Sequence, residues 1–204
     1  MGGGGHARVV LSMLKNINGY RLLGYTDLKD HGQMLGVPYL GTDAEVNSLL
    51  AIHSGLQAVL GVGQVGLGGK RQELWSKWRS LPLTFPVVVS QDAIISEGAM
   101  VGEATQVMVG AVINCGATLG RGVIVNTNST VEHDVQISDW VHIGPGATIC
   151  GDCKIGRHSM VGAGATVIQG ISIAENCLVG AGATVVRDIT EPGVYGGCPA
   201  LRIN

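Results

Sequence analysis

Aromatic residues are scarce in this 204-residue sequence: Phe, Trp and Tyr together make up 4 % of it, and only one Phe occurs. Globular cores normally depend on such large side chains, whereas the 33 glycines suit a repetitive structure with a thin core. Charged residues are also few, at 14 %, and the net charge is −2 with no basic tract. Neither nucleic acid nor an anionic membrane is therefore an expected partner.

Long hydrophobic runs and a cysteine framework are missing too. No apolar run approaches the roughly 20 residues that span a bilayer, and no signal-peptide pattern opens the sequence. The five cysteines are odd in number and scattered, unlike the pairs of a secreted disulfide-rich domain. These features predict a cytoplasmic protein.

What the sequence does contain is a repeat of six residues from Val89 to Thr190. The first residue of each block is always Val, Ile or Leu, through Val185 in the last block, without one inserted residue. The fifth residue is Ala, Ser, Thr, Cys, Val or Ile, from Ala93 to Ile189. A repeat this regular indicates a solenoid.

A period of six fits neither a helix nor a simple strand. It fits a flat side about six residues long, with the first and fifth residues inward and a turn between sides. Three sides make one eighteen-residue coil, and successive coils stack as parallel strands about 4.8 Å apart. The pattern resembles the hexapeptide repeat of the left-handed parallel β-helix, which predicts a mainly β prism over residues 87–190.

Residues 1–86 lack the repeat and predict a small α/β, Rossmann-like unit with a parallel sheet. Helices are expected over residues 8–16 and 70–78, a further helix after the capping box that starts at Thr42, and strands over residues 20–26 and 57–63. A glycine-rich turn of the kind seen at residues 2–5 normally follows a first strand, and here it directly follows Met1. Residues 191–204 leave the repeat and are expected to form a loop.

Two histidines stand close together within the repeat. His133 is third in its block, an outward position, and lies between Glu132 and Asp134. A carboxylate that accepts the ring N–H orients a histidine base and strengthens it. His142 is sixth in its block and is expected at an exposed corner. His31, His53 and His158 have no such neighbours and are interpreted as solvated.

Glycine and alanine form a second pattern. Residues 144–148, 162–166 and 180–184 begin eighteen residues apart and should stack on successive coils, leaving a groove for an extended chain such as pantetheine. Gly151 likewise lies eighteen residues after His133. Its backbone N–H is then placed to stabilise the oxyanion of an acyl-transfer reaction.

Five features of the sequence resemble the NeuD/PglD-type sugar acyltransferases. They are the Gly-Gly-His segment near the start, the strand ending at Asp27, the prism with its segment 126–134, the corner at His142 and the closing segment 197–200. This resemblance covers nearly the whole chain. It implies an acetyl-CoA-dependent enzyme that acetylates the amino group of a nucleotide-linked 4-amino-deoxy sugar. It also implies a homotrimer with active sites between prisms, a role in cell-surface polysaccharide biosynthesis, and no metal.

The resemblance assigns roles to residues of this chain. His133 matches the general base and Asp134 the acid beside it. The positions that match those near acetyl-CoA are His142, Gly151, Ala163 and Ala181. The positions that match those holding the nucleotide-sugar are Gly4, Gly5, His6, Asp27 and Gly63. One departure is Leu28, which stands where some relatives have a second acid. In the implied mechanism His133 deprotonates the attacking amine directly, with no acyl-enzyme.

Other functions remain open at this point. The same fold and base would serve O-acetylation of a sialic acid or another sugar hydroxyl. A γ-type carbonic anhydrase needs a pair of zinc histidines about five residues apart, whereas the spacings here are nine (133 to 142) and sixteen (142 to 158). A non-enzymatic scaffold explains the repeat but not the Glu-His-Asp segment. Cys150 and Cys153 have CxxC spacing, but Cys153 is an inward fifth residue, which disfavours a metal or redox role.

Overall fold

The computed structural model describes residues 2–203, which divide into two compact units. The N-terminal unit contains the chain up to Gly63 together with Lys70–Pro86. The second unit begins at Val87, and the segment Gln64–Gly69 belongs to it.

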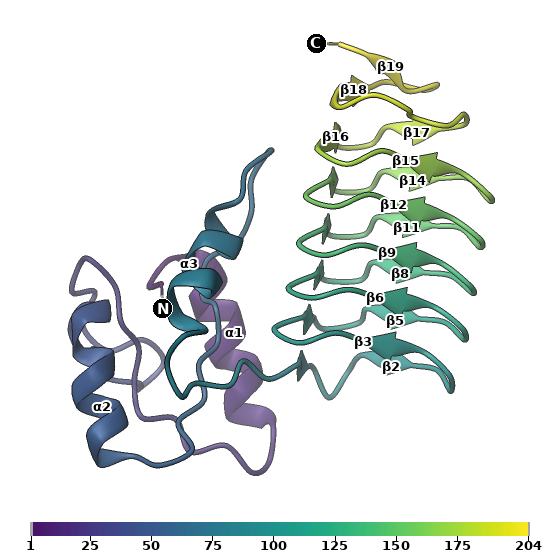
Figure 1. Ribbon diagram of the computed structural model, residues 1–204. Coiled ribbons are helices and arrows are strands. Elements are labelled where there is room, and N and C mark those ends of the chain that lie inside the picture. The colour runs from purple at the N-terminus through teal and green to yellow at the C-terminus, as the bar shows by residue number, and fades with distance from the viewer. Residues whose placement is uncertain (1, 204) are drawn as a thin grey trace. The chain divides into compact units, whose positions relative to one another are not determined.

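The second unit is a stack of short strands at six-residue intervals (Figure 1). These strands are β1 (Val88–Val89), β2 (Ile94–Ile95), β3 (Met100–Val101), β4 (Gln106–Val107), β5 (Val112–Ile113), β6 (Thr118–Leu119), β7 (Ile124–Val125), β8 (Thr130–Val131), β9 (Gln136–Ile137), β10 (His142–Ile143), β11 (Thr148–Ile149), β12 (Lys154–Ile155), β13 (Met160–Val161), β14 (Thr166–Val167), β15 (Ser172–Ile173), β16 (Cys177–Val179) and β17 (Thr184–Val185). Each strand contains the first residue of a block, preceded by the sixth residue of the block before it. The repeat therefore places its β-branched residues within the strands, as their β propensity favours.

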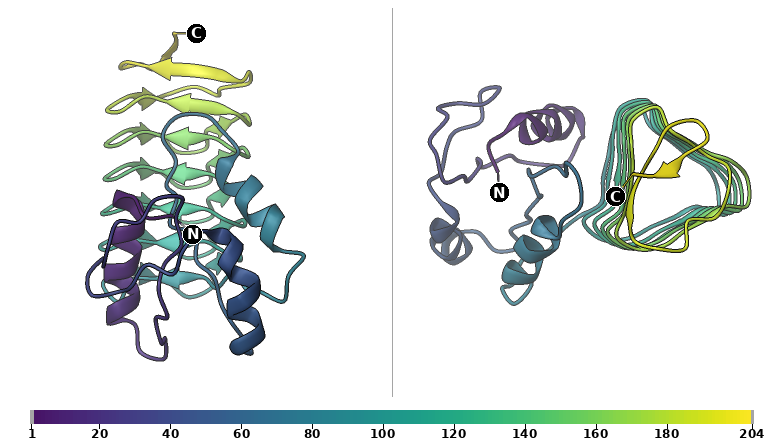
Figure 2. Two further views of the ribbon diagram at one scale, coloured as in Figure 1. Left: turned by 90° about the vertical axis from the view of Figure 1, so that its left-hand side faces the viewer. Right: turned by 90° about the horizontal axis from the view of Figure 1, so that it is seen from above.

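Every strand of the prism pairs in parallel with the strand eighteen residues away. Val88 is opposite Gln106, for example, and His142 is opposite Met160. The pairs build three sheets, and the coils trace a triangle when seen from above (Figure 2). The expected β-helix with eighteen residues per coil is confirmed.

The core of the prism consists of the first and fifth residues of the blocks. Val107 and Ile113, both first residues, are fully buried, as are the fifth residues Ala111 and Cys153. Small fifth residues fit because the three sides converge there. The turns between sides place their fourth residue at positive φ, which is why Gly or Asp so often occupies it; Asp134 has φ 60°.

The expectation of a loop after residue 190 is wrong in part. Strand β18 (Gly193–Gly196) pairs in parallel with β16, and β19 (Leu201–Arg202) pairs antiparallel with β18. The last coil would otherwise end in unpaired backbone groups, and the tail satisfies them. An ion pair of 2.6 Å between Arg202 Nη1 and Glu191 Oε2 holds the returning chain.

The N-terminal unit is helical. It contains α1 (Gly5–Asn16), the 3₁₀ helix η1 (Asp43–Glu45), α2 (Val46–Ile52) and α3 (Lys70–Trp78), close to the expected ranges. The hydroxyl of Thr42 accepts the amide of Ala44 and so caps η1. Among residues 2–203, no helix combines the length and the apolar character needed to cross a membrane.

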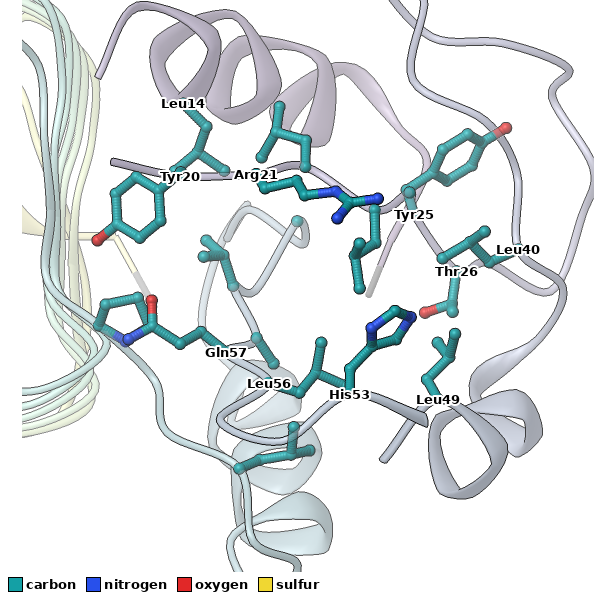
Figure 3. A pocket seen from close by; sticks show the side chains of 18 of the residues that line it. Leu14, Tyr20, Arg21, Tyr25, Thr26, Leu40, Leu49, His53, Leu56 and Gln57 are labelled. Carbon is teal, nitrogen blue, oxygen red and sulfur yellow. The ribbon is translucent and has the colours of Figure 1, made fainter. Parts of the chain in front are cut away.

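The two strands expected in this unit are not formed as such. The described part of the unit contains isolated bridges in place of strands: two parallel ones, between Tyr25 and Tyr39 and between Gln57 and Thr84, and an antiparallel one between Met34 and Val37. Both parallel pairs border the same cavity (Figure 3), whose lining includes residues 22–26 and 56–59. The segments at Tyr25 and Gln57 each pair with another segment on one side only. They therefore form few of the hydrogen bonds of a regular sheet.

Candidate functional site

The expected histidine–carboxylate pair is present at one corner of the prism. His133 and Asp134 form the turn between β8 and β9, and His133 Nδ1 lies 2.9 Å from Asp134 Oδ2. The turn is fixed by the previous coil, since the Asp134 amide donates to the carbonyl of Cys115 over 3.1 Å. The side chains of His133 and Asp134 are 43 % and 62 % exposed, so solvent or a substrate reaches them.

The hydrogen bond to Asp134 raises the pKa of His133, and the negative charges of Asp134, Asp152 and Glu132 raise it further, against the opposing effect of partial burial. Glu132 is itself held in place, because its Oε2 accepts the side-chain amide of Asn114, one coil earlier, over 2.9 Å. The surrounding carboxylates thus strengthen His133 as a base.

Gly151 lies directly against the other edge of the His133 ring. A Cβ atom at Gly151 would be 2.5 Å from His133 Nε2, a distance that real contacts do not reach. The next residue ties the two coils together, since the Asp152 amide donates to the His133 carbonyl over 3.1 Å. Within residues 2–203 the amide of Gly151, which was expected to act as an oxyanion donor, donates no hydrogen bond.

Asp152 is a member of this cluster that the sequence analysis missed. Its carboxylate, that of Asp134 and the ring of His133 place their ligand atoms within 4.8 Å of one another. The eighteen-residue register predicts the position of Asp152. It lies one coil after Asp134, just as Gly151 lies one coil after His133. Within the described residues this is the one group of three potential metal ligands, and it holds a single histidine, unlike a γ-type carbonic anhydrase site.

The expectation that His142 stands at an exposed corner is wrong. It lies within β10 and is only 6 % exposed. Its Nδ1 is 2.9 Å from the carbonyl oxygen of Gln64, which requires a proton on Nδ1, and its Nε2 then accepts the side-chain amide of Asn126 over 3.0 Å. Burial follows because the segment Gln64–Gly69 lies over this strand, a contact between residues far apart in the sequence.

The glycine–alanine column stacks as expected, but at a different corner from His133. The amide of Gly164 donates to Pro145, and that of Gly182 to Ala163, over 2.9 and 2.8 Å. Ala163 and Ala181 are exposed there, on turns between the sheet of β10 and that of β11, and His142 lies beside this column. His133 and Gly151 occupy the next corner, so one side of the prism separates His133 from the column within a chain.

The residues assigned to the nucleotide-sugar gather at the start of α1. The amide of Gly3 donates to the Asp27 carboxylate, and a Cβ atom at Gly63 would come within 3.3 Å of His6. Gly4 caps α1 without a side chain, and a Cβ atom at Gly4 or Gly5 would meet no other atom within 4 Å. Space for a ligand is thus present at this helix N-terminus.

The pKa of Asp27 is lowered. Burial alone would raise it, but hydrogen bonds from the amides of Lys29 and Gly3 and the nearby His31 stabilise the carboxylate. Gly3 was not among the expected site residues, although it completes the turn that holds Asp27.

Family comparisons match both parts of the sequence. Residues 1–67 match the PglD N-terminal domain, and residues 134–169 and 152–187 match the bacterial transferase hexapeptide (six repeats). A comparison with curated protein sequences finds no significant match.

Solved structures match over nearly the full length. The acetyltransferase domain of PglB from Neisseria gonorrhoeae FA1090, in complex with acetyl coenzyme A, is 33 % identical with a TM-score of 0.91, over 98 % of this chain and 95 % of that one. PerB from Caulobacter crescentus, in complex with CoA and GDP-perosamine, is 31 % identical with a TM-score of 0.90, over 100 % and 95 %. WeeI from Acinetobacter baumannii AYE, at 20 % identity, TM-score 0.88 and coverage of 99 % and 97 %, shares the fold.

Proposed function

Because the chain belongs to the NeuD/PglD-type sugar acetyltransferases, we propose that it transfers an acetyl group from acetyl-CoA to the amino group of a nucleotide-linked 4-amino-deoxy sugar. That the chain is an acetyl-CoA-dependent sugar acetyltransferase follows from its family. The choice of an amine as acceptor is supported by the likeness to PerB, which binds GDP-perosamine, an amino sugar. The observation that carries the proposal is the contact of His133 with Asp134 on one side and Gly151 on the other.

In the proposed reaction His133 is the general base. Nδ1–H donates a hydrogen bond to the Asp134 carboxylate, so Nε2 carries the lone pair and faces the space beside Gly151. The amine attacks the thioester carbonyl while Nε2 removes its proton, and the amide of Gly151 stabilises the negative charge on the carbonyl oxygen. The intermediate then collapses with cleavage of the C–S bond, and the protonated Nε2 returns its proton to the departing thiolate, which leaves as CoA. A primary amine is already a nucleophile, so no acyl-enzyme is needed.

Binding of acetyl-CoA is assigned to His142, Gly151, Ala163 and Ala181. The exposed Ala163 and Ala181 leave the edges of two successive coils open to an extended pantetheine chain. His142 is held in one orientation by Asn126 and Gln64 at the start of this column. The nucleotide-sugar is assigned to Gly4, Gly5, His6, Asp27 and Gly63 around the N-terminus of α1.

A homotrimer is part of the proposal. Within one chain, His133 and the column containing Ala163 lie at neighbouring corners, separated by a full side of the prism. A second prism packed against that side would bring its own column to the base of the first, and it would cover the exposed His133 and Asp134. We place this trimer in the cytoplasm, acting in cell-surface polysaccharide biosynthesis.

The test is an acetyl-transfer assay that follows CoA release with UDP-, GDP- and dTDP-linked 4-amino sugars and with CMP-sialic acid. We expect turnover with one of the amino sugars and a loss of about 10²- to 10⁴-fold in the His133→Ala variant. His158→Ala is the matched control, since His158 lies at another corner of the prism, and it should retain activity. Turnover with CMP-sialic acid alone would instead establish O-acetylation, and full activity of His133→Ala would exclude His133 as the base.

A further inference from the structure

Three polar side chains form a ladder along the prism that ends beside His133. Ser96, Asn114 and Glu132 are each the second residue of a block, and they follow β2, β5 and β8 on successive coils (Figure 1). All three residues are half-buried. The later residues at this position on the same side are Cys150, Ile168 and Val186. The strongly polar part of this column therefore stops at the level of the proposed base.

The hydrogen bonds of the ladder run in one direction. Ser96 Oγ donates to Asn114 Oδ1 over 3.3 Å, and Asn114 Nδ2 donates to Glu132 Oε2 over 2.9 Å. An amide oxygen only accepts and an amide nitrogen only donates, so the bond from Ser96 turns the NH2 group of Asn114 towards Glu132. The ladder thus offers a donor to a carboxylate, which only accepts when it is ionised.

The Glu132 carboxylate is held against the backbone of the turn and not against the ring of His133. Its Oε2 also accepts the amide of His133, over 3.4 Å. The pKa of His133 is raised first by the hydrogen bond to Asp134, and the charge of Glu132 adds to this effect. Glu132 therefore acts on the ring through its charge, and that action depends on the distance between the carboxylate and the ring.

The titratable groups around His133 come from its own turn and from the two neighbouring coils. They are Glu132, Asp134, Asp152 and Cys115. The ring itself holds Asp134, whereas Glu132 depends on Asn114, the one side chain within residues 2–203 that forms a hydrogen bond with it. A glutamate has several rotatable bonds, so without this partner its charged end would spread into solvent, where its effect on the ring is screened.

We propose that Asn114 is a positioning residue for His133: it holds the Glu132 carboxylate at a fixed distance from the ring, and Ser96 orients Asn114 for this role. The proposal rests on the role of His133 as the base of the proposed reaction. Asn114 acts through Glu132 and has no assigned contact with either substrate.

The test is a double-mutant cycle read out by the pKa of His133, which an NMR titration of its Cε1 proton measures in the full chain. Asn114→Leu keeps the approximate size of the side chain and removes its hydrogen bonds. Glu132→Gln removes the charge and keeps an oxygen that accepts from Asn114. We expect each single variant to lower the pKa of His133 by on the order of half a pH unit, and the double variant to lower it no further.

Two further variants calibrate this cycle. Ser96→Ala keeps Asn114 but removes the group that orients it, so the pKa of His133 should fall in the same direction by less. Ser138→Ala is the matched control, because Ser138 is also the second residue of its block but lies on another side of the prism. It should leave the pKa of His133 unchanged.

An unchanged pKa of His133 in Asn114→Leu would overturn the proposal, as would additive effects of the two substitutions. Both outcomes are distinct from a failure of the proposed function, because the titration involves no acetyl transfer. If the pKa responds as expected while His133→Ala keeps full activity, the positioning of Glu132 stands and the role of His133 as base fails.

Discussion

The ring of His133 packs against the backbone of Gly151 on the next coil so closely that no side chain fits between them; a Cβ atom there would be 2.5 Å from Nε2. Glycine at this position therefore restricts the orientation of the His133 ring. The contact also places the backbone of Gly151 next to Nε2, the nitrogen that receives the proton in the proposed mechanism.

Replacing Gly151 with Ala should disable the base without unfolding the protein. The added methyl group displaces the exposed ring of His133, and a displacement of about 1 Å costs on the order of a hundredfold in rate. We expect kcat to fall by about that factor, with little change in the thermal midpoint, because the ring can move into solvent. Steady-state kinetics and thermal unfolding measure the two effects.

A double-mutant cycle separates this contact from a general disturbance of the coil. In a His133→Ala background the ring is gone, so Gly151→Ala should lower neither stability nor residual activity further. An unchanged additional loss in that background would show that the methyl group acts elsewhere.

The acid limb of the pH–rate profile should respond to Asp134. The proposed mechanism requires neutral His133, so we expect activity to fall as the pH drops through its pKa, which Asp134 raises. Asp134→Asn removes that charge and lowers the pKa of His133, so the acid limb should move to lower pH, while the maximal rate falls by about tenfold or more because the ring is held less well. The profile of kcat/KM against pH is the measurement. An acid limb that stays in place would mean that another group titrates.

Asp152 should act on His133 through charge alone. It raises the pKa of His133 from the neighbouring coil and is not the hydrogen-bond partner of Nδ1. Asp152→Asn should therefore move the acid limb in the same direction as Asp134→Asn but less far, with a nearly unchanged maximal rate. A loss of maximal rate as large as that of Asp134→Asn would instead place Asp152 in direct contact with the substrate.

Replacing His142 should loosen a segment remote in sequence. Its Nδ1 holds the carbonyl of Gln64, so His142→Ala leaves residues 64–69 without that anchor. We expect faster hydrogen exchange over these residues, and a higher KM for acetyl-CoA. Asn126→Ala, which removes only the partner of Nε2, should affect the KM but leave the segment in place. Unchanged exchange over residues 64–69 in His142→Ala would contradict this account.

Replacing a large buried side chain of the prism core with Ala should destabilise the protein strongly. Ile143 is fully buried, and Ile143→Ala should cost about 2–5 kcal/mol through lost contacts and a residual cavity. Ile94, which is 60 % exposed, provides the control, and its replacement by Ala should cost less than about 0.5 kcal/mol. Chemical denaturation measures both, and equal costs would mean that the first coil is covered in solution.

The six-residue period was sufficient to predict the prism because, in a solenoid, the burial of a residue depends only on its position within the repeat. The same regularity located Gly151 next to His133, since residues one coil apart are neighbours. The same register predicts that Asp152 lies next to Asp134, one coil away.

Contacts outside the repeat could not be found in this way. Nothing local to His142 reveals that Gln64, seventy-eight residues earlier, covers it. The pairing of Gly193 with Cys177 was equally hidden, because it depends on the open edge of the last coil and not on a pattern in the tail. The strands expected over residues 20–26 and 57–63 are reduced to isolated bridges at Tyr25 and Gln57.

The eighteen-residue register restricts how the length of this protein can change. Inserting one six-residue block between Asp134 and Gly151 would preserve every hydrophobic position and every turn, yet it would rotate all later turns to the next corner of the triangle. His133 would then face a different residue, and the proposed base would lose its proposed oxyanion donor although the hydrophobic pattern was intact. A length change that keeps the two corners in step must come in whole coils.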